Sequence, residues 1–295
     1  MTPSDMTSPD SAAATWLPSP GLYVVATPIG NLGDLSERAI VVLRSAALVA
    51  AEDTRTTRIL LRRAQSPAKV VSLTEHNVED RIPSLLETAS RAVAALVSEA
   101  GTPLIADPAA RLVAEAHRRG IRVSPIPGPS ALTAALSVAG FEVRDVLFAG
   151  FAPRKPGELR ELFARARGAA RLLVLFERAN RLPTLLEAAA DALGDPEAAV
   201  CREMTKLHEE IARGRCSTLA GRFRTARGEC TVVIALPEPE TRPESEARRL
   251  LAAMRRAGAR RSHAAAEVAR LTGVPRDRVY RLWEDSNGAP EGNGS

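Results

Sequence analysis

The sequence contains few cysteines and histidines, which argues against a disulfide-stabilised fold and against a metal centre. Cys201, Cys216 and Cys230 are odd in number and lack the CxxC spacing of many zinc sites. The four histidines are scattered, at positions 76, 117, 208 and 263. We therefore expect neither disulfides nor metal ligands.

Long apolar runs are also missing. No window approaches the ~20 consecutive apolar residues of a membrane-spanning helix. Residues 1–20 are rich in Ser, Thr, Pro and Ala and lack the basic and apolar regions of a signal peptide. We expect residues 1–20 to be a disordered tail and the protein to be cytoplasmic, with no membrane association. At 295 residues with 45% hydrophobic content, the chain is long enough for two globular domains.

Lysine is scarce although the chain is basic. The formal net charge is +5 at pH 7, which suits a polyanionic partner. Nearly all basic residues are arginines, and the lysines are Lys69, Lys155 and Lys206. We interpret Lys155 and Lys206, which lie in motif-like segments, as candidate functional residues.

Alternating strand-like and helical segments predict an α/β fold. Apolar runs at 93–97 and 121–126 each end in a loop rich in Gly and Pro that opens a helix. The helices are expected at 108–119, with Asp107 as N-cap and Pro108 first, and at 131–139. This order is typical of parallel strands with right-handed crossovers, which bring both loops to one sheet edge, where small molecules bind.

A third loop of this kind, 27–34, follows a strand expected at 22–26 and lacks the G-x-G-x-x-G nucleotide fingerprint. Ser36 or Asp34 can cap the helix that follows, and Asp53 or Thr54 the next one. Further strands are expected at 47–51, 69–73, 146–150, 171–176, 198–201 and 229–236, and further helices at 182–193 and 219–225.

The composition changes near Gly140, and a Pro-rich linker at 237–243 precedes three helical periods at 244–257, 262–272 and 275–283. The last two are spaced as in a helix-turn-helix, with Gly273 in the turn. We therefore expect five parts: a disordered tail (1–20), an N-terminal α/β domain (21–140), a C-terminal α/β domain (141–240), a basic helical module (241–285) and a disordered tail (286–295).

Seven ordered segments resemble one known family. They are TPIGNLGDLSERAI, AEDTRTTRILL, SEAGTPLIADP, PIPGPSALTAALSVAG, GFAPRKPGELR, REMTK and GECTVVI. In this order they are similar to the ribosomal RNA small-subunit methyltransferase I family, whose fold is that of the tetrapyrrole methylases. The resemblance covers residues 21–283. It implies two α/β domains with S-adenosylmethionine (SAM) between them, and methyl transfer to the 2′-hydroxyl of a cytidine in the decoding region of small-subunit (16S) ribosomal RNA. It also implies the small ribosomal subunit as partner and a homodimer.

The matching segments imply a set of cofactor contacts. These are Thr27, Pro28, Glu99, Gly101, Thr102, Pro103, Ile105, Ser130, Ala131, Glu177 and Met204. The sequence departs from the family pattern at Glu99, where the family has Asp, and at Phe176 and Arg178, where the family has Tyr and Ser.

Methyl transfer to a hydroxyl requires that the hydroxyl lose its proton, so a nearby carboxylate or lysine is a candidate general base. The candidates are Glu177, Glu203 and Lys206, with an ion-pair network at the cleft edge as the alternative interpretation. Candidate RNA-binding residues are Arg154, Lys155, Arg260, Arg261 and Arg276.

Two other functions fit parts of the sequence. A methylase of the same superfamily that acts on a tetrapyrrole-like small molecule would need the cleft but not the basic C-terminal helices. A non-enzymatic regulator would bind nucleic acid through the helix-turn-helix and sense a metabolite with the larger part of the chain.

Overall fold

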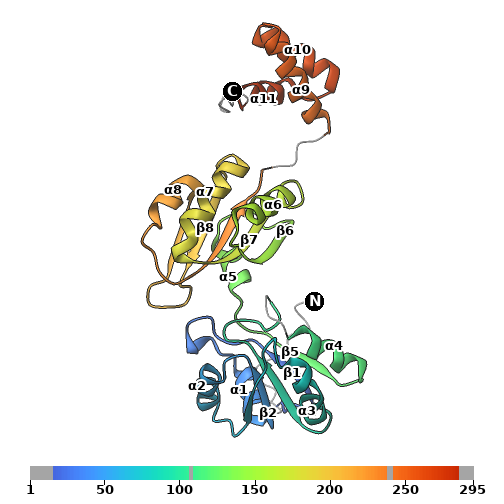
Figure 1. Cartoon of the computed structure of the whole chain (residues 1–295), viewed down its shortest axis with the longest axis vertical. Helices are drawn as coiled ribbons and strands as arrows, with labels where there is room; N and C mark the ends of the chain where they lie inside the picture. Colours follow the sequence, from blue (N-terminus) through green and yellow to red (C-terminus); the bar gives the residue numbers. More distant parts are fainter. Residues whose placement is uncertain (1–15, 106–108, 238–241, 286–295) are drawn as a thin grey trace, which may run out of the picture.

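The computed structural model describes residues 16–105, 109–237 and 242–285. These residues form two five-stranded sheets, flanked by helices, and a separate group of three helices (Figure 1). Asp107 and Pro108, the expected helix start, lie outside the described residues, as do most of the two expected tails. Residues 16–20 contact the first sheet: Tyr23 Oη donates to the carbonyl of Ser19 (2.8 Å), and the Trp16 ring packs edge-on against Tyr23.

The first sheet is parallel, and its strand order is β3-β2-β4-β1-β5. Its strands are β1 (Gly21–Val25), β2 (Leu48–Ala51), β3 (Lys69–Ser72), β4 (Val93–Val97) and β5 (Val123–Ile126). The expected parallel arrangement is confirmed. Because β1 lies between β4 and β5, the loops after these three strands leave the same sheet edge side by side.

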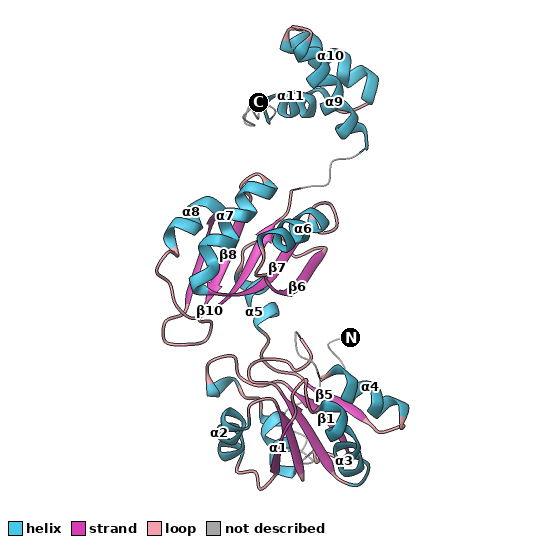
Figure 2. Ribbon diagram, in the orientation of Figure 1, coloured by secondary structure: helices cyan, strands magenta, loops and turns pink. Residues whose placement is uncertain are grey.

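Helices cover both faces of this sheet (Figure 2). They are α1 (Glu37–Ser45), α2 (Thr54–Ala64), α3 (Val78–Arg91) and α4 (Ala110–Arg118), and the short 3₁₀ helix η2 (Leu32–Asp34) precedes α1. Leu43 of α1 and Leu61 of α2 share the core on one face, and α3 and α4 bury Leu85 and Leu112 on the other. Ser36 accepts from the Ala39 amide (3.2 Å) and caps α1, as expected.

The second sheet is mixed, with strand order β6-β7-β10-β8-β9. Its strands are β6 (Val146–Phe151), β7 (Leu172–Arg178), β8 (Glu197–Arg202), β9 (Glu210–Arg215) and β10 (Glu229–Ala235). Only β6 and β7 pair in parallel, whereas β10 runs antiparallel to both β7 and β8.

One face of the second sheet packs against α6, α7 and α8 through residues such as Phe163 and Leu186. Its helices are α5 (Ala131–Val138), α6 (Pro156–Ala166), η3 (Ala179–Arg181), α7 (Leu182–Leu193) and α8 (Cys216–Arg222). Helix α5 lies against the opposite face, between the two sheets (Figure 2). The helix expected at 219–225 is α8, which begins at Cys216 and ends at Arg222, with Phe223 as its C-cap. Leu219 and Ala220 are buried within it.

Three C-terminal helices form a cluster with a core of its own. They are α9 (Arg242–Arg256), α10 (Arg261–Thr272) and α11 (Arg276–Asp285). Leu251, Val268, Val279 and Leu282 are buried within this cluster. Gly273 ends α10 with φ +73°, which confirms the expected helix-turn-helix. Among the residues described, every helix is too short or too polar to cross a membrane.

Candidate active site

The loops after β1 and β4 are joined by backbone hydrogen bonds. The amide of Thr27 donates to the carbonyl of Gly101 (2.9 Å), and the amide of Gly101 donates to Thr27 (3.0 Å). Thr102 Oγ1 then donates to the carbonyl of Pro129, in the loop after β5 (3.2 Å). Three loops from three strands therefore form one connected surface at the carboxyl edge of the sheet.

Gly101 has a backbone conformation that favours glycine. Its φ is +83°, and a Cβ there would lie 3.4 Å from Ile29 Cγ2 and 3.7 Å from the carbonyl oxygen of Pro129. The residue is buried. A side chain would therefore strain the backbone, although its Cβ would make only ordinary van der Waals contacts with the neighbouring loops.

A cleft of about 320 Å³ separates this loop surface from the second sheet. Its volume is at the lower end of the range for small-molecule sites, about 300–1,000 Å³. From the first half it is lined by Ile29, Glu99, Ala100, Gly101, Thr102, Ile105, Ser130 and Ala131. From the second it is lined by Phe151, Phe176, Glu177, Arg178, Cys201, Glu203, Met204, Lys206, Glu229, Cys230 and Thr231.

Most of the candidate cofactor and catalytic residues line this cleft. They are Glu99, Gly101, Thr102, Ile105, Ser130, Ala131, Glu177, Glu203, Met204 and Lys206. Thr27, Pro28 and Pro103 do not line it and are buried. Thr27 Oγ1 instead donates to the carbonyl of Ser98 (3.2 Å), so its position supports the loops.

Sequence reasoning did not find the cleft residues of β10 or the aromatic pair Phe151 and Phe176. Glu229, Cys230 and Thr231 enter the cleft because β10 is inserted antiparallel between β7 and β8. That insertion is a long-range pairing that no local pattern reveals. Phe151 is 67% exposed. Because aromatic residues are scarce in this chain, its presence was a signal that could have indicated a site residue.

Glu177 is the most deeply buried charged residue of the cleft, with a side chain 5% exposed. Its Oε1 accepts from the Arg178 amide (2.8 Å). Its Oε2 lies 3.4 Å from Arg181 Nη2, without the alignment of a hydrogen bond, and has no hydrogen-bond partner among the described residues. A buried carboxylate oxygen without such a partner is costly, and the nearby Arg181 charge offsets part of that cost.

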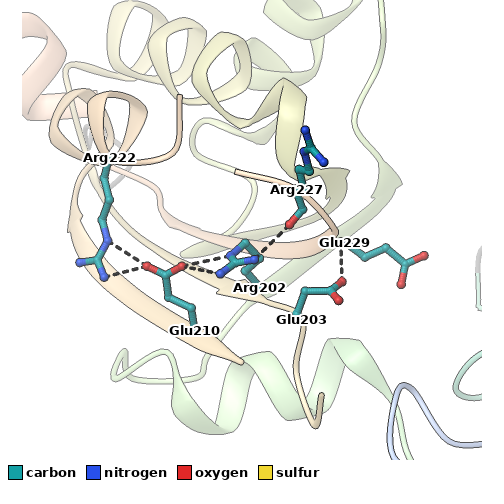
Figure 3. A network of polar contacts seen from close by, with 6 residues as sticks. All are labelled: Arg202, Glu203, Glu210, Arg222, Arg227 and Glu229. Carbon is teal, nitrogen blue, oxygen red and sulfur yellow. Dashed lines mark hydrogen bonds and ion pairs between the residues drawn. The ribbon is translucent and has the colours of Figure 1, made fainter. Parts of the chain in front are cut away.

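Glu203, Lys206 and Glu229 form an ion-pair network at the cleft wall. Lys206 Nζ donates to Glu203 Oε1 (3.0 Å) and to Glu229 Oε2 (3.1 Å). The Glu229 amide also donates to Glu203 Oε1 (2.9 Å), the contact drawn in Figure 3. Glu203 has φ +50°, and a Cβ on the neighbouring Gly228 would lie 2.5 Å from Glu203 Oε1. The turn after β8 is therefore tightly packed.

The charges in this network are mutually stabilised. Burial raises the pKa of Glu203, but hydrogen bonds from the Glu229 amide and Lys206, together with the charges of Lys206 and Arg202, outweigh it and lower the pKa. Burial likewise opposes the charge of Lys206, but its bonds to the two carboxylates raise its pKa. Both residues are therefore charged near neutral pH, as in the ion-pair interpretation, and Lys206 is poorly suited to accept a proton.

A second network fixes the hairpin of β8 and β9 that carries this turn (Figure 3). Glu210 Oε1 accepts from Arg222 Nη2 (2.7 Å), and Glu210 Oε2 accepts from Arg202 Nε (3.0 Å). Arg202 Nη1 also donates to the carbonyl of Arg227 (3.1 Å). Arg202 thus links the hairpin to the segment that leads into β10.

The three cysteines are free and buried. Burial raises the pKa of Cys201 to about 11 and that of Cys230 to about 12, and both residues line the cleft. Their thiols therefore stay protonated and unreactive at neutral pH. The described residues contain no cluster of three or more His, Cys, Asp or Glu side chains suited to a metal ion.

The candidate RNA-binding residues lie outside the cleft and are exposed. Lys155 pairs with Glu158 (3.0 Å) at the start of α6. Arg261 pairs with Glu284, and the guanidinium groups of Arg261 and Arg276 lie 5.0 and 5.7 Å from the centre of the Tyr280 ring. The structure therefore places them as surface cations at the starts of three helices, α6, α10 and α11.

The sequence matches the family model of tetrapyrrole (corrin/porphyrin) methylases over residues 21–220, and the chain belongs to this family. Solved structures agree on the fold. A cobalt precorrin-4 methyltransferase of cobalamin biosynthesis aligns with a TM-score of 0.57 at 18% identity, covering 72% of this chain and 94% of its own. A uroporphyrin-III C-methyltransferase from Thermus thermophilus aligns with a TM-score of 0.54 at 21% identity, covering 74% of this chain and 94% of its own.

Curated relatives narrow the family further. The ribosomal RNA small subunit methyltransferase I of Mesorhizobium japonicum is 40% identical over 281 residues, which are 93% of this chain and 95% of that protein. Its counterpart from Thermotoga maritima is 41% identical over 217 residues, 72% of this chain and 97% of that protein. The chain is thus a member of the ribosomal RNA small subunit methyltransferase I family, and the resemblance noted in the sequence is confirmed.

Proposed function

We propose that this protein transfers a methyl group from SAM to small-subunit ribosomal RNA, at the 2′-hydroxyl of a cytidine in the decoding region. The proposal rests on one observation above all. Nine of the ten candidate residues that line the cleft lie in segments that resemble the rRNA methyltransferase family, and they meet although these segments follow strands of two different sheets.

The cleft fits a SAM-sized molecule that has both apolar and cationic parts. Ile29, Ile105 and Met204 provide apolar surface, and the backbone of the Gly101 loop can approach a ligand closely. The Glu177 carboxylate lines the cleft and suits a cationic or amine donor. When bound, SAM supplies a methyl group on a sulfonium, which is already activated for transfer.

The protein's contribution is then mainly orientation and exclusion of water, because the methyl donor needs no further activation. We assign Glu177 to holding the cofactor or accepting the proton of the ribose hydroxyl, since it is the most deeply buried carboxylate that lines the cleft. We assign Glu203 and Lys206 to the charged wall that fixes the turn after β8.

A homodimer and a cytoplasmic site of action belong to the same proposal. Large apolar side chains are exposed around the edge strand β6 and at the end of α5: Val146 is 36% exposed, Phe151 67% and Val138 46%. An edge strand that exposes apolar side chains is suited to pairing with a second copy. Sedimentation of the purified protein measures this directly.

The deciding experiment incubates the protein with labelled SAM and small ribosomal subunits and maps the labelled nucleotide. Transfer to the 2′-hydroxyl of one cytidine is expected. Label on a tetrapyrrole but not on the subunit would support the small-molecule alternative instead. Sequence-selective binding of duplex DNA without methyl transfer would support the regulator.

A further inference from the structure

Helix α2 carries an unusual concentration of positive charge on its exposed side. Arg55, Arg58, Arg62 and Arg63 are all exposed, and the helix contains no acidic residue between Thr54 and Ala64. Glu52 and Asp53 precede it, and Asp53 accepts from the Arg55 amide (2.6 Å) as the N-cap. The charged side chains toward the C-terminal end of α2 are therefore all basic.

A hollow of about 650 Å³ lies beside this basic end, between α2 and β3. Arg58, Arg62 and Lys69 supply its charged groups, and Gln65 and Ser66 supply polar ones. No aromatic side chain lines it. The hollow is thus suited to anionic groups and not to stacked rings.

These cations have no acidic partners among the residues that the structure describes, whereas many arginines elsewhere do. On α4, which packs on the opposite face of the same sheet, Arg111 pairs with Glu79, and Arg118 and Arg119 pair with Glu115. Like charges placed together without carboxylates repel one another, so the arrangement favours an anionic partner from outside the chain.

The polypeptide around the hollow is held in place. Gln65 ends α2 with φ +52°, and its amide donates to the carbonyl of Arg62 (3.1 Å). Ser66 Oγ donates to the carbonyl of Leu43 and accepts from the Ala68 amide (3.2 Å). The turn that joins α2 to β3 is therefore pinned to the neighbouring helix α1.

Helix α2 runs from the sheet edge that carries the cleft loops toward the hollow. Helix α2 begins directly after β2, at the carboxyl edge of the sheet where the cleft loops also leave. Its eleven residues extend about 16 Å, and Arg55, Arg58 and Arg62 follow one another along it at rises of about 4.5 and 6 Å. A polyanion seated at the cleft can continue along this row of charges.

We propose that the α2 surface, formed by Arg58, Arg62 and Lys69, binds the phosphate backbone of the substrate RNA at a distance from the methylated nucleotide. The inference rests on the proposed function. Guanidinium and ammonium groups without aromatic neighbours contact phosphates and carry no base preference. The surface therefore contributes affinity and orientation, while nucleotide choice is made at the cleft.

The test compares two triple variants of the full chain. Arg58→Gln/Arg62→Gln/Lys69→Gln removes the α2 surface, and Arg111→Gln/Arg118→Gln/Arg119→Gln removes three charges from α4. Binding of small ribosomal subunits is measured across a salt series, with SAM binding and thermal unfolding as folding controls. For the α2 variant we expect at least about tenfold weaker subunit binding at low salt. Its log–log salt slope should be shallower by about 2, because three phosphates are no longer neutralised, at about 0.7 each. SAM affinity should not change.

Two results would overturn this inference without affecting the proposed function. One is wild-type subunit binding by a folded α2 variant. The other is an equal loss of subunit affinity in the α4 variant, which would indicate an effect of total charge. A wild-type protein that methylates no ribosomal RNA would overturn the proposed function and, with it, this inference. Because wild-type methylation is measured first, the two failures are distinguishable.

Discussion

Gly30 and Lys206 belong to different halves of the molecule, and a Cβ on Gly30 would lie 2.4 Å from Lys206 Cγ. The same Cβ would lie 2.9 Å from Thr205 Oγ1 and 3.0 Å from the carbonyl oxygen of Met204. The loop after β1 and the turn after β8 therefore meet at a point where only a glycine fits. This contact fixes how closely the two walls of the cleft approach each other.

Gly30→Ala should push these walls apart and weaken SAM binding by about tenfold or more, a loss of about 1.4 kcal/mol. Gly30 has no left-handed backbone angle, so the effect is steric. Calorimetric titration with SAM measures it. Gly157→Ala is the control, because its Cβ would meet no atom within 4 Å. Equal SAM affinity in the Gly30 and Gly157 variants would contradict the prediction.

Gly101→Val should abolish SAM binding. A branched side chain is strained at φ +83° and fills space where the backbone of the loop meets a ligand. Gly120→Val is a matched control, since Gly120 has φ +66° but open space around its Cβ. Both variants should lose about 1–3 kcal/mol of stability, and only the Gly101 variant should lose SAM binding in calorimetry. Wild-type affinity in a folded Gly101 variant would remove this loop from the site.

The strand-loop-helix pattern of residues 93–139 could be predicted from sequence because both periods are local. Val93–Val97 is an uninterrupted buried strand, and Gly120 and Gly140 end the following helices with positive φ, as turn chemistry requires. Helix α3 was not predicted, and Pro83 within it is a residue that usually ends helices.

The site could be predicted only in part, for the same physical reason. Residues in loops at the ends of parallel strands share an edge once the strands are found, so Gly101, Ser130 and their neighbours were expected together, and they line one cleft. Strand β9 and the insertion of β10 depend on long-range pairing, so Glu229 was missed. The pairing of Lys206 with Glu203 and Glu229 likewise forms only in the folded chain, so the sequence does not show whether its amine is free or paired.

Lys206→Arg should retain methyl transfer to within about tenfold, whereas Lys206→Gln should lose more than that. The raised pKa of Lys206 indicates that it acts as a cation, and charge-assisted hydrogen bonds contribute about 1.5–3 kcal/mol each. Single-turnover methylation of subunits at neutral pH measures the rates. If arginine were as inactive as glutamine, a proton-accepting amine would be indicated instead.

The stabilising effect of the Glu203–Lys206 pair should disappear at both ends of the pH range. The pKa of Glu203 is lowered from 4.5, so its contribution is present above that value and lost as pH falls through the lower pKa of the folded state. The pKa of Lys206 is raised from 10.5, so its contribution is present below that value and lost as pH rises through the higher folded pKa.

Urea unfolding of wild type and Glu203→Gln from pH 3 to pH 11 checks this dependence. The difference in unfolding free energy should be widest between about pH 5 and 10, where we expect about 1 kcal/mol for a partly exposed pair. It should narrow on either side. A difference that stays constant over the whole range would mean that the pair does not contribute through its charges.

The three C-terminal helices divide their arginines between structure and surface. Arg255 donates to the carbonyl of Trp283 (2.6 Å) with its guanidinium over the Trp283 ring (4.1 Å), and Arg278 pairs with Glu244 (2.7 Å). These contacts hold the cluster together. The exposed arginines that remain are Arg249, Arg256, Arg260, Arg261, Arg270, Arg276 and Arg281. Clustered surface cations gain affinity for RNA through counterion release.

A chain that ends at Pro237 should therefore bind SAM as the full chain does but bind small ribosomal subunits more weakly. All the residues that line the cleft precede Pro237. The salt dependence should also be shallower, by about 0.7 for each phosphate that the shortened chain no longer neutralises. Arg260→Gln/Arg276→Gln in the full chain should weaken subunit binding in the same direction without removing the helices. If truncation instead impaired folding or SAM binding, the helices would be covering the second sheet or a dimer surface. Unchanged subunit binding across the salt series would exclude the helices from the RNA interface.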